Sequence, residues 1–545
     1  MDKFHKKILL GELGVTIAFA IAMLFPIDTW AQGTGAQINE SALGQTLYVD
    51  QSNSSASDSN PGTAGQPFLT IGRAVTAAAL AVNSGTDVVI GPGTYRESIN
   101  LGAFSASDAA PLILEASAPG QTIITGSDVW TGWQNTSFGI YTHPWPYSWG
   151  DAPTPAGWPA LEPIVTRREM VFVNGTALQQ VLSMPLPGPG TFNVVDGGTI
   201  TIWPATGTNI STATIEVATR SGLLQTPNGI SQLVLRGLLF EHDNTAVNAS
   251  GNGAVKLVGG SNILVDSCIF NDNNWLGLSI SGGPAQAITV ENSRADHNGE
   301  NGISLSKLNN LLFDQDQTSS NNWRGFAGGF TSFDADGMKV SRIHNATFSN
   351  YVSAYNETGG AWFDTDNENI VLDSLQFCGN LTNGLFIEAS QGPATISNSQ
   401  FLSNVGVGLQ LANSTGITLT NTVLNSNAKA ILIGGSDTPR SVTNYATSQV
   451  YSLLMSNMTI QNNDVSGTLS SQYFLTSSLS SSWALFVQTL SSNYNVWYNP
   501  ANVMGFSTKF GRQNLPGWQH SSQQDQNSVA TNPGDQIPAY CGIAD

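Results

Sequence analysis

Charged residues are scarce in this sequence. They make up 10% of its 545 residues, against about 25% in ordinary soluble domains. Asp and Glu outnumber Lys and Arg by 38 to 19, which gives a formal net charge of −19. This shortage of positive charge argues against nucleic acid as a partner, because phosphate groups bind to basic surfaces. We therefore expect a surface that hydroxyl and amide groups keep soluble.

Cysteine is equally rare. The chain has three cysteines, Cys268, Cys378 and Cys541, which lie far apart. An odd number at such spacings defines neither a disulfide framework nor a zinc site. We therefore expect each of them to be a buried thiol.

Long apolar runs are missing apart from one near the N-terminus. Residues 14–25 are apolar, follow the basic stretch of residues 1–7 and precede Ala31. The run is shorter than the roughly 20 residues of a membrane-spanning helix, and the layout is typical of a secretory signal peptide. We predict a signal peptide over residues 1–31. The mature protein would then be secreted, periplasmic or on the cell surface, with no membrane attachment after cleavage.

What the sequence has in abundance is a repeat. A glycine followed by alternating apolar residues recurs about every 24 residues, as in Gly277-LSIS, Gly302-ISLS, Gly360-AWFD, Gly384-LFIE and Gly408-LQLA. A period in the twenties with strand alternation indicates a solenoid. Further short strands and Asn-rich turns within each period predict an all-β fold, a right-handed parallel β-helix. A leucine-rich repeat fits less well, because its Leu/Asn consensus is missing.

We expect the mature chain to have four segments. Residues 34–128 are predicted to form an N-terminal cap and the first coils, with an amphipathic capping helix over residues 67–82. The period is lost in residues 129–225, where short strands between Asn-Gly, Gly-Gly and Pro predict an inserted antiparallel β-sandwich. Residues 226–435 would form the central coils with the active site, and residues 436–545 irregular coils and a tail.

Alternation along each strand separates interior from exterior positions. Residues one and three after the repeat glycine are apolar and should point inward, among them Ile303, Leu385 and Leu409. Residues two and four after it should face solvent. In two adjacent coils these outward positions combine an aromatic residue with a carboxylate: Trp362 with Asp364, and Phe386 with Glu388.

Asp364 and Glu388 are expected to form a pair. Neighbouring parallel strands lie about 4.7–4.9 Å apart, so two carboxyl groups in the same register should be about 5 Å apart. Such proximity disfavours double ionisation, and a separation of about 5–5.5 Å is that of a retaining glycosidase. Trp362 and Phe386 would offer apolar faces to a sugar ring. The competing interpretation is that the two are unrelated surface acids. It names no structural benefit that would offset the repulsion between them.

The two motifs also carry a family resemblance. GGAWFDTDNENI, followed by NGLFIEASQGPATISNSQF, resembles the paired motif of the β-xylosidases of glycoside hydrolase family 120, which combine a parallel β-helix with an inserted β-sandwich. It is equally similar to many uncharacterised secreted β-helix proteins of the pectin-lyase-like type. The first resemblance implies that Asp364 is the nucleophile and Glu388 the general acid/base. Asp366 departs from the family pattern, and we expect it to contact the substrate.

One interval of the repeat is enlarged. Between Gly325 and Gly360 the chain is about ten residues longer than one coil. The extra segment should bulge outward beside the same face, and loops on rigid scaffolds often carry binding residues. Candidate substrate contacts there are Arg324, Asp334, Asp336 and Lys339, although a plain solvated loop explains each of them equally well.

Three functions fit these residues. The first is a retaining, β-xylosidase-like glycoside hydrolase that acts on plant-type oligo- or polysaccharide without a cofactor or metal. The second is a Ca²⁺-dependent polysaccharide lyase or epimerase, with Lys339 as base and carboxylates as metal ligands: Asp334, Asp336, Asp364 and Asp366. The third is a non-catalytic surface β-helix that binds glycans. Carbohydrate is the partner in all three.

Overall fold

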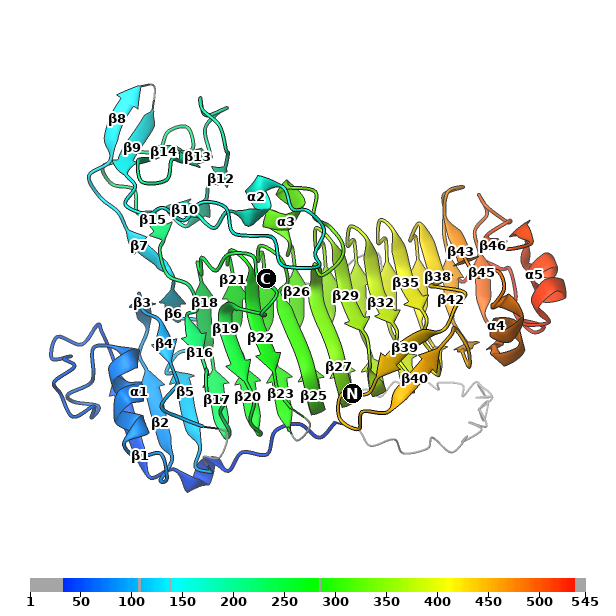
Figure 1. The fold of residues 1–545 in the computed structure, drawn as a ribbon, viewed down its shortest axis with the longest axis horizontal. Coiled ribbons are helices and arrows are strands. Elements are labelled where there is room, and N and C mark those ends of the chain that lie inside the picture. Colours follow the sequence, from blue (N-terminus) through cyan, green and yellow to red (C-terminus); the bar gives the residue numbers. More distant parts are fainter. Residues whose placement is uncertain (1–32, 106–108, 138, 284–285, 535–545) are drawn as a thin grey trace, which may run out of the picture. The chain divides into compact units, whose positions relative to one another are not determined.

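The computed structural model describes residues 33–105, 109–137, 139–283 and 286–534. The chain divides into two compact units, residues 1–31 and residues 32–545. All described residues belong to the second unit, so the predicted signal peptide lies outside them. Figure 1 shows this unit as a stack of coils that runs from β1 at one end to α5 at the other.

Three parallel ladders run along the stack and confirm the parallel β-helix. The first contains β1 (Gln45–Val49), β2 (Thr86–Ile90), β5 (Leu112–Ala116), β17 (Leu233–Arg236), β20 (Ile263–Asp266), β23 (Ile288–Glu291), β25 (Ile303–Asp314), β27 (Asp336–Ser349), β30 (Glu368–Asp373), β33 (Ala394–Ser397), β36 (Ile417–Thr420), β41 (Thr459–Gln461) and β44 (Ser491–Asn493).

The second ladder shares the long strands β25 and β27 with the first, so the two form one 24-stranded sheet. Its other strands are β4 (Ile99–Asn100), β16 (Leu224–Gln225), β19 (Gly253–Val258), β22 (Leu276–Ser281), β29 (Gly359–Asp364), β32 (Asn383–Glu388), β35 (Val407–Ala412), β38 (Lys429–Gly434), β43 (Tyr473–Ser477), β46 (Phe506–Thr508) and the antiparallel β47 (Gly511–Gln513).

The third ladder is a separate 12-stranded sheet. It contains β3 (Gly93–Tyr95), β6 (Thr122–Thr125), β18 (Leu238–Glu241), β21 (Ile269–Asn271), β24 (Arg294–Asp296), β26 (Gln317–Ser319), β28 (Val352–Ala354), β31 (Gln376–Cys378), β34 (Gln400–Leu402), β37 (Val423–Asn425), β42 (Asp464–Ser466) and β45 (Val496–Tyr498).

The core follows the predicted alternation. Ile303, Leu385 and Leu409 are 0% exposed, because every second side chain of a strand points into the coil. Most outward positions are half-buried. Ser279 and Ala412 differ from the expectation, because both are buried although they occupy outward positions. The outward face of the second ladder is therefore only partly open to solvent.

Asparagines stack at the corner between the third and second ladders. The side-chain amide of each except the last donates to the side-chain carbonyl of the next coil's asparagine, at 2.9–3.0 Å. All seven are buried. Since a buried amide needs partners for both its donor and its acceptor, the ladder repeats in register from coil to coil: Asn273, Asn298, Asn321, Asn356, Asn380, Asn404 and Asn427.

The predicted N-terminal helix forms over a shorter range. Helix α1 (Ile71–Ala79) begins after Thr70, whose side chain accepts a hydrogen bond from the Arg73 amide. Its buried residues Ile71, Ala74, Val75 and Ala78 belong to the same core cluster as the coils. Figure 1 shows α1 beside β1 and β2, and a short 3-10 helix η1 (Glu40–Ala42) precedes β1.

The inserted segment forms two small sheets. One contains β11 (Thr176–Ala177), β10 (Val171–Val173), β15 (Ile215–Ala218) and β7 (Ser127–Val129); the other contains β12 (Gln179–Gln180), β13 (Thr191–Val194), β14 (Thr199–Trp203), β9 (Ile140–Pro144) and β8 (Gln134–Ser137). All pairings are antiparallel except β12 with β13. They enclose their own core around Trp145, Phe192 and Val217. Helix α2 (Pro163–Thr166) also belongs to this segment, and its neighbour α3 (Trp323–Ala327) belongs to the coils.

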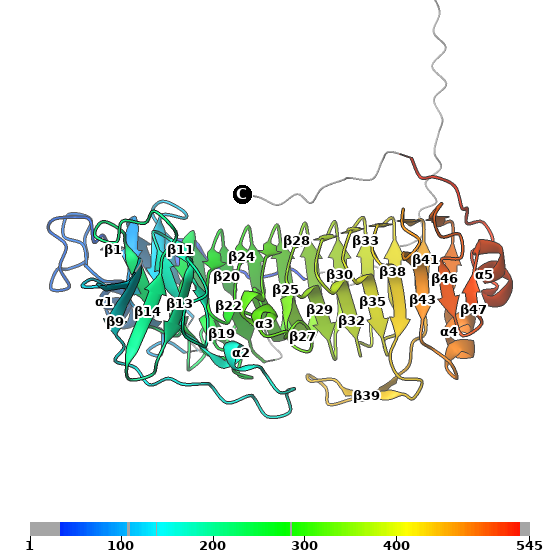
Figure 2. The ribbon, with the colours of Figure 1, turned by 90° about the horizontal axis from the view of Figure 1, so that it is seen from above.

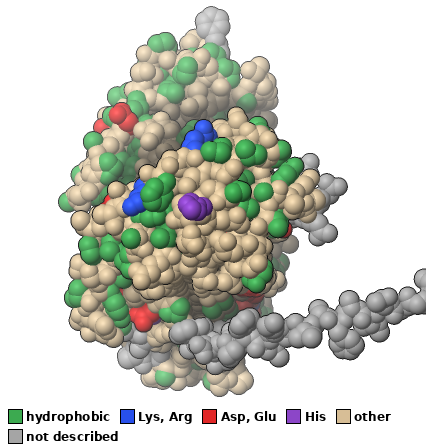
Figure 3. Space-filling view, turned by 90° about the vertical axis from the view of Figure 1, so that its right-hand side faces the viewer, with side chains coloured by type: hydrophobic (Ala, Val, Ile, Leu, Met, Phe, Trp, Pro, Cys, Tyr) green, Lys and Arg blue, Asp and Glu red, His purple; other side chains and the backbone are tan. Residues whose placement is uncertain are grey.

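Beyond β38 the coils are interrupted by an antiparallel hairpin of β39 (Arg440–Thr443) and β40 (Val450–Leu453). Figures 1 and 2 show it lying along the outer face of the large sheet. Helices α4 (Trp483–Thr489) and α5 (Leu515–Ser522) lie at the far end of the stack. Figure 3 looks onto that end, where most of the described surface is uncharged and only isolated acidic, basic and histidine side chains are visible.

Two remaining predictions concern cysteines and membrane spans. Cys268 is a free, buried thiol as expected, whereas the same expectation for Cys378 is wrong, because this residue is disulfide-bonded. Cys541 lies outside the described residues. None of the helices in the described ranges is long and apolar enough to cross a membrane.

Candidate active site

The two predicted acids lie side by side on the second ladder. Strand β29 pairs with β32 in a register that places Asp364 opposite Glu388 and Trp362 opposite Phe386. The residues between them, Phe363 and Ile387, point into the core and are 2% and 1% exposed. Both carboxylates end their strands and are half-exposed, with 27% and 19% of the side chain accessible.

Each carboxylate has its own cation. Lys339 Nζ lies 3.3 Å from Asp364 Oδ2, and Arg440 forms an ion pair with Glu388. The Thr365 hydroxyl also donates to Asp364 Oδ1 at 2.8 Å. These contacts offset the repulsion between two like charges on adjacent strands. The site is therefore two carboxylates and two cations on one face.

The aromatic pair is arranged differently from the expectation. The rings of Trp362 and Phe386 stack on each other, with centroids 5.1 Å apart and planes inclined by 25°. Lys339 Nζ lies 3.1 Å from the Trp362 ring centroid, which is a cation–π contact. Lys339 and Phe386 flank Trp362 in the strand register. Both faces of the indole are thus covered, and a sugar ring would meet the edge of Trp362 and not its face.

Asp366 is not on the open face. It is 0% exposed, and its oxygens contact His344 Nε2 at 3.3 Å, Gln391 Nε2 at 2.6 Å and the Tyr445 amide at 2.7 Å. Thr365 and Asp366 have φ values of 49° and 61°. This left-handed turn ends the strand alternation immediately after Asp364, so the next acid turns away from the site.

The hairpin that carries Arg440 is tied back to these coils. The side-chain amide of Asn444 donates to Glu368 Oε2 at 2.8 Å, and the Tyr445 hydroxyl donates to the Leu308 carbonyl at 3.0 Å. Val442 and Leu453 pack with Ala389 in a small buried cluster. The hairpin is therefore a fixed wall at the Glu388 end of the site.

The enlarged loop brings only some of its candidates to the site. Asp334 Oδ1 lies 3.7 Å from Lys339 Nζ, and its side chain is 36% exposed. Asp336 is 4% exposed, and its Oδ2 has no hydrogen-bond partner. Burial raises the pKa of Asp336 well above its usual value, and Lys339 opposes that shift. Asp336 therefore lies beneath the face rather than on it.

Glu300 is a second buried acid near Lys339. It is 1% exposed, and its Oε1 has no hydrogen-bond partner. Burial raises the pKa of Glu300 well above its usual value, with Asp334 adding to the shift and Lys339 opposing it. Lys339 is thus the one positive group common to three carboxylates whose pKa values are raised: Glu300, Asp334 and Asp336.

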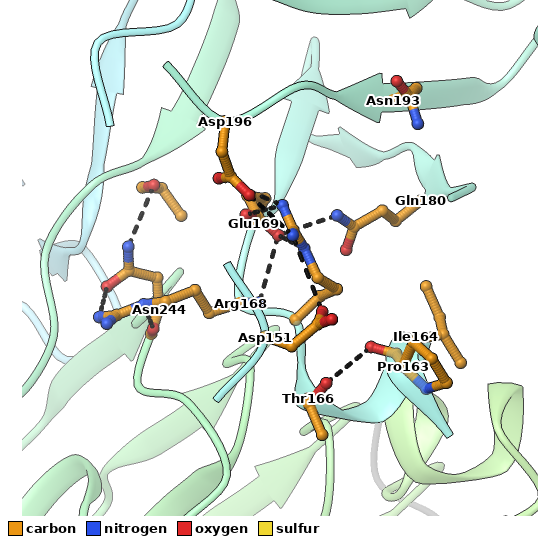
Figure 4. A network of polar contacts seen from close by, with 12 residues as sticks. Asp151, Pro163, Ile164, Thr166, Arg168, Glu169, Gln180, Asn193, Asp196 and Asn244 are labelled. Carbon is orange, nitrogen blue, oxygen red and sulfur yellow. Dashed lines mark hydrogen bonds and ion pairs between the residues drawn. The ribbon is translucent and has the colours of Figure 1, made fainter. Parts of the chain in front are cut away.

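Arg324 is not brought to the site either. It is 1% exposed and donates to the carbonyls of Ile164 and Glu169 and to the side-chain oxygen of Gln180. All three partners belong to the inserted segment. Figure 4 shows the neighbouring polar network, in which Gln180 and Glu169 lie together. Arg324 therefore joins the insert to the coils.

Sequence reasoning missed Arg440 and Glu300. Arg440 lies 52 residues beyond Glu388 and outside the repeat, so no spacing marks it. Glu300 stands at a turn among other polar residues and has no local signal. In the described ranges no group of three or more His, Cys, Asp and Glu side chains is arranged to hold a metal ion.

Comparisons with known proteins agree with this architecture. The family described as a right handed beta helix region matches residues 329–446 and 383–499. No curated protein sequence matches the chain. The structure of XylC with xylose is similar, with a TM-score of 0.64 and 14% identity, over 90% of this chain and 87% of that one.

Two further structures are similar at lower scores. A glycoside hydrolase has a TM-score of 0.49 and 10% identity over 71% of this chain and 95% of its own. The A-module of the Azotobacter vinelandii mannuronan C-5 epimerase AlgE4 has a TM-score of 0.46 and 14% identity over 89% of this chain and all of its own. At 14% identity, the similarity to XylC shows the fold alone. The chain is a right-handed parallel β-helix.

Proposed function

We propose that this protein is a retaining glycoside hydrolase, β-xylosidase-like, that acts outside the cytoplasm on plant-type oligo- or polysaccharide. The observation that carries the proposal is the in-register pair of Asp364 and Glu388 on adjacent strands. Strand spacing of about 4.8 Å favours a carboxyl separation near the about 5–5.5 Å of retaining enzymes over the about 6.5–9.5 Å of inverting ones. The fold shared with XylC, a structure with bound xylose, supports the sugar class.

In the proposed reaction, Asp364 attacks the anomeric carbon while Glu388 donates a proton to the leaving oxygen. Water then breaks the glycosyl–Asp364 bond, with Glu388 as the base that takes its proton. These roles rest on the resemblance to the family 120 β-xylosidases. Both acids end rigid strands, so the coil spacing fixes their relative position, as a displacement on opposite sides of one sugar carbon requires.

The two cations have separate tasks in this proposal. Lys339 pairs with Asp364 and orients its carboxylate. Arg440 is 40% exposed and contacts Glu388. A protonated Glu388 offers less attraction to a guanidinium than an ionised one, so Arg440 has to move away from Glu388 before proton donation. The exposed position of its side chain allows that movement.

No metal takes part in the proposed chemistry, and this separates it from the lyase or epimerase alternative. A chelator should leave hydrolysis unchanged, whereas a Ca²⁺-dependent lyase would lose activity. A glycan-binding protein without catalysis would bind the same oligosaccharides and release no product.

The test is product stereochemistry with an activated aryl xyloside. Proton NMR of the first product should show the anomeric configuration of the substrate, and the opposite anomer would overturn retention. With Glu388→Ala, added azide should restore turnover by forming a glycosyl azide of retained configuration. A folded Glu388→Ala variant that azide does not rescue would show that Glu388 is not the acid/base. Glu368→Ala, which removes a nearby acid bonded to Gln391 and Asn444, is the control and should gain nothing from azide.

A further inference from the structure

A cavity lies away from the carboxylate pair, between the insert and the coils. It has a volume of about 400 Å³. Its walls are largely apolar and come from both segments, and they include Met170, Phe172, Leu178, Phe192 and Phe326. None of its lining residues belongs to the pair or to the aromatic stack beside it. The volume falls within the roughly 300–1,000 Å³ range of small-molecule sites.

Two neighbouring N–H donors in this wall have no partner. Trp323 Nε1 and Arg324 Nε are buried atoms without a hydrogen bond, and both residues line the cavity. The Arg324 guanidinium carbon lies 4.7 Å from the Trp323 ring centroid, so the two donors are close enough to serve one ligand group. Buried donors without acceptors are costly, and each such group in a native structure calls for an explanation.

Arg324 also carries a charge that its contacts do not balance. Its three hydrogen bonds go to two carbonyls and one side-chain amide. Across the described residues it forms no ion pair with a carboxylate, since the nearby Glu169 carboxylate is held by Arg167 and Gln180. Burial lowers the pKa of Arg324 to about 9, which is the physical sign of an uncompensated buried cation.

Two of the charged side chains in the cavity wall pair with each other. His297 Nδ1 lies 2.6 Å from Asp272 Oδ1, so these two residues neutralise each other when His297 is protonated. Burial raises the pKa of Glu357, and His297 opposes that shift. Glu169 also lines the cavity, but its carboxylate is bonded to Arg167 and Gln180. Arg324 is therefore the buried charged side chain of the wall that has no carboxylate bonded to it.

We propose that this cavity binds a small amphipathic carboxylate, with a ring among the apolar side chains and a carboxylate head on Arg324 and Trp323. Donor-only groups require an acceptor, and an uncompensated guanidinium favours an anionic one. The apolar walls require a ring or short chain behind that head. The proposal concerns a site apart from the carboxylate pair and does not depend on the glycosidase assignment.

Benzoate is the probe, titrated into the purified full-length protein by calorimetry, with benzyl alcohol as its neutral counterpart. We expect saturable binding of one benzoate per chain and at least tenfold weaker binding of benzyl alcohol. Trp323→Phe removes a donor that has no partner in the free protein, so it should leave folding intact. It should weaken benzoate about tenfold, as loss of a hydrogen bond to a charged group does.

A second variant closes the mouth of the cavity. Ala327 is exposed and lines it, so Ala327→Trp should abolish binding, whereas the exposed Ala501 lies elsewhere and Ala501→Trp should leave binding unchanged. The proposal is overturned if folded wild-type protein shows no saturable benzoate binding. Equal affinity for benzyl alcohol, or unchanged benzoate binding in both Trp323→Phe and Ala327→Trp, would overturn it as well.

Discussion

Two parts of the molecule gather carboxylates and cations in opposite ways. On the face of β29 and β32, Asp364 and Glu388 are half-exposed, and each has one cation. At the insert junction, Glu169 is 0% exposed and is held by Arg167 through two hydrogen bonds and by Gln180 through a third. Figure 4 shows this second arrangement.

This difference in burial distinguishes a candidate active site from a structural network of ion pairs. A buried carboxylate with both oxygens bonded is not free to bind a ligand, and neutralising it weakens several charge-assisted hydrogen bonds at once. A half-exposed carboxylate at a strand end keeps lone pairs free for chemistry and costs little to neutralise. Substitutions on the face of β29 and β32 should therefore lower activity and leave stability unchanged. Substitutions at the insert junction should lower stability and leave activity unchanged.

Asp364→Asn should have the largest effect. The amide cannot act as a nucleophile, so kcat should fall by about 10⁴-fold, while the urea midpoint should stay close to that of the wild type. Asp373→Asn is the matched control, because Asp373 also ends its strand and takes no part in the pair. An Asp364→Asn variant that keeps its activity would place catalysis elsewhere.

Glu169→Gln should destabilise the protein by about 3 kcal/mol, because it weakens the two charge-assisted bonds from Arg167, while Arg167 keeps Asp196 as a partner at 3.1 Å. Chemical denaturation measures the loss, and kcat per folded molecule should be unchanged. Glu115→Gln offers the comparison: its ion pair with Arg236 is about a quarter exposed and should contribute no more than about 1 kcal/mol. Equal losses of stability in the two variants would show that the buried Glu169 contacts contribute no more to stability than a partly exposed ion pair does.

Asp366→Asn tests whether this acid supports the hairpin. Asparagine has one acceptor oxygen in place of two, so it cannot accept both the Gln391 bond and the bond from the Tyr445 backbone amide, at a cost of about 3 kcal/mol. Residues 436–456 should then exchange amide hydrogens faster, as measured by mass spectrometry. If exchange in that hairpin stays at the wild-type rate, Asp366 does not hold it.

Glu241 predicts the pH dependence of stability. Burial, with repulsion from Glu216 and Asp272, raises its pKa from 4.5 to about 7. Between these values the native state keeps a proton that the unfolded chain releases, so its contribution to stability is present at low pH and is lost as pH rises. Relative to wild type, Glu241→Gln should gain about 3 kcal/mol between pH 4.5 and pH 8. Parallel stability curves for the two proteins would refute this.

The sequence alone determined the coil and the placement of the pair. The repeat glycine fixed the register, and a side-chain period of two then set which residues enter the core. For this reason Ile303, Leu385 and Leu409 are buried as predicted, and Asp364 stands opposite Glu388. Both inferences needed only local periodicity, which a solenoid carries directly from sequence into space.

Only the tertiary structure decided what surrounds the pair. Arg440 reaches Glu388 from a hairpin outside the repeat, and Arg324 lies under the insert, away from the face. Asp366 turns inward because two left-handed residues end the strand alternation. The repeat predicts no contacts where the chain leaves the coil, because contacts there depend on how separate segments pack and not on their spacing along the sequence.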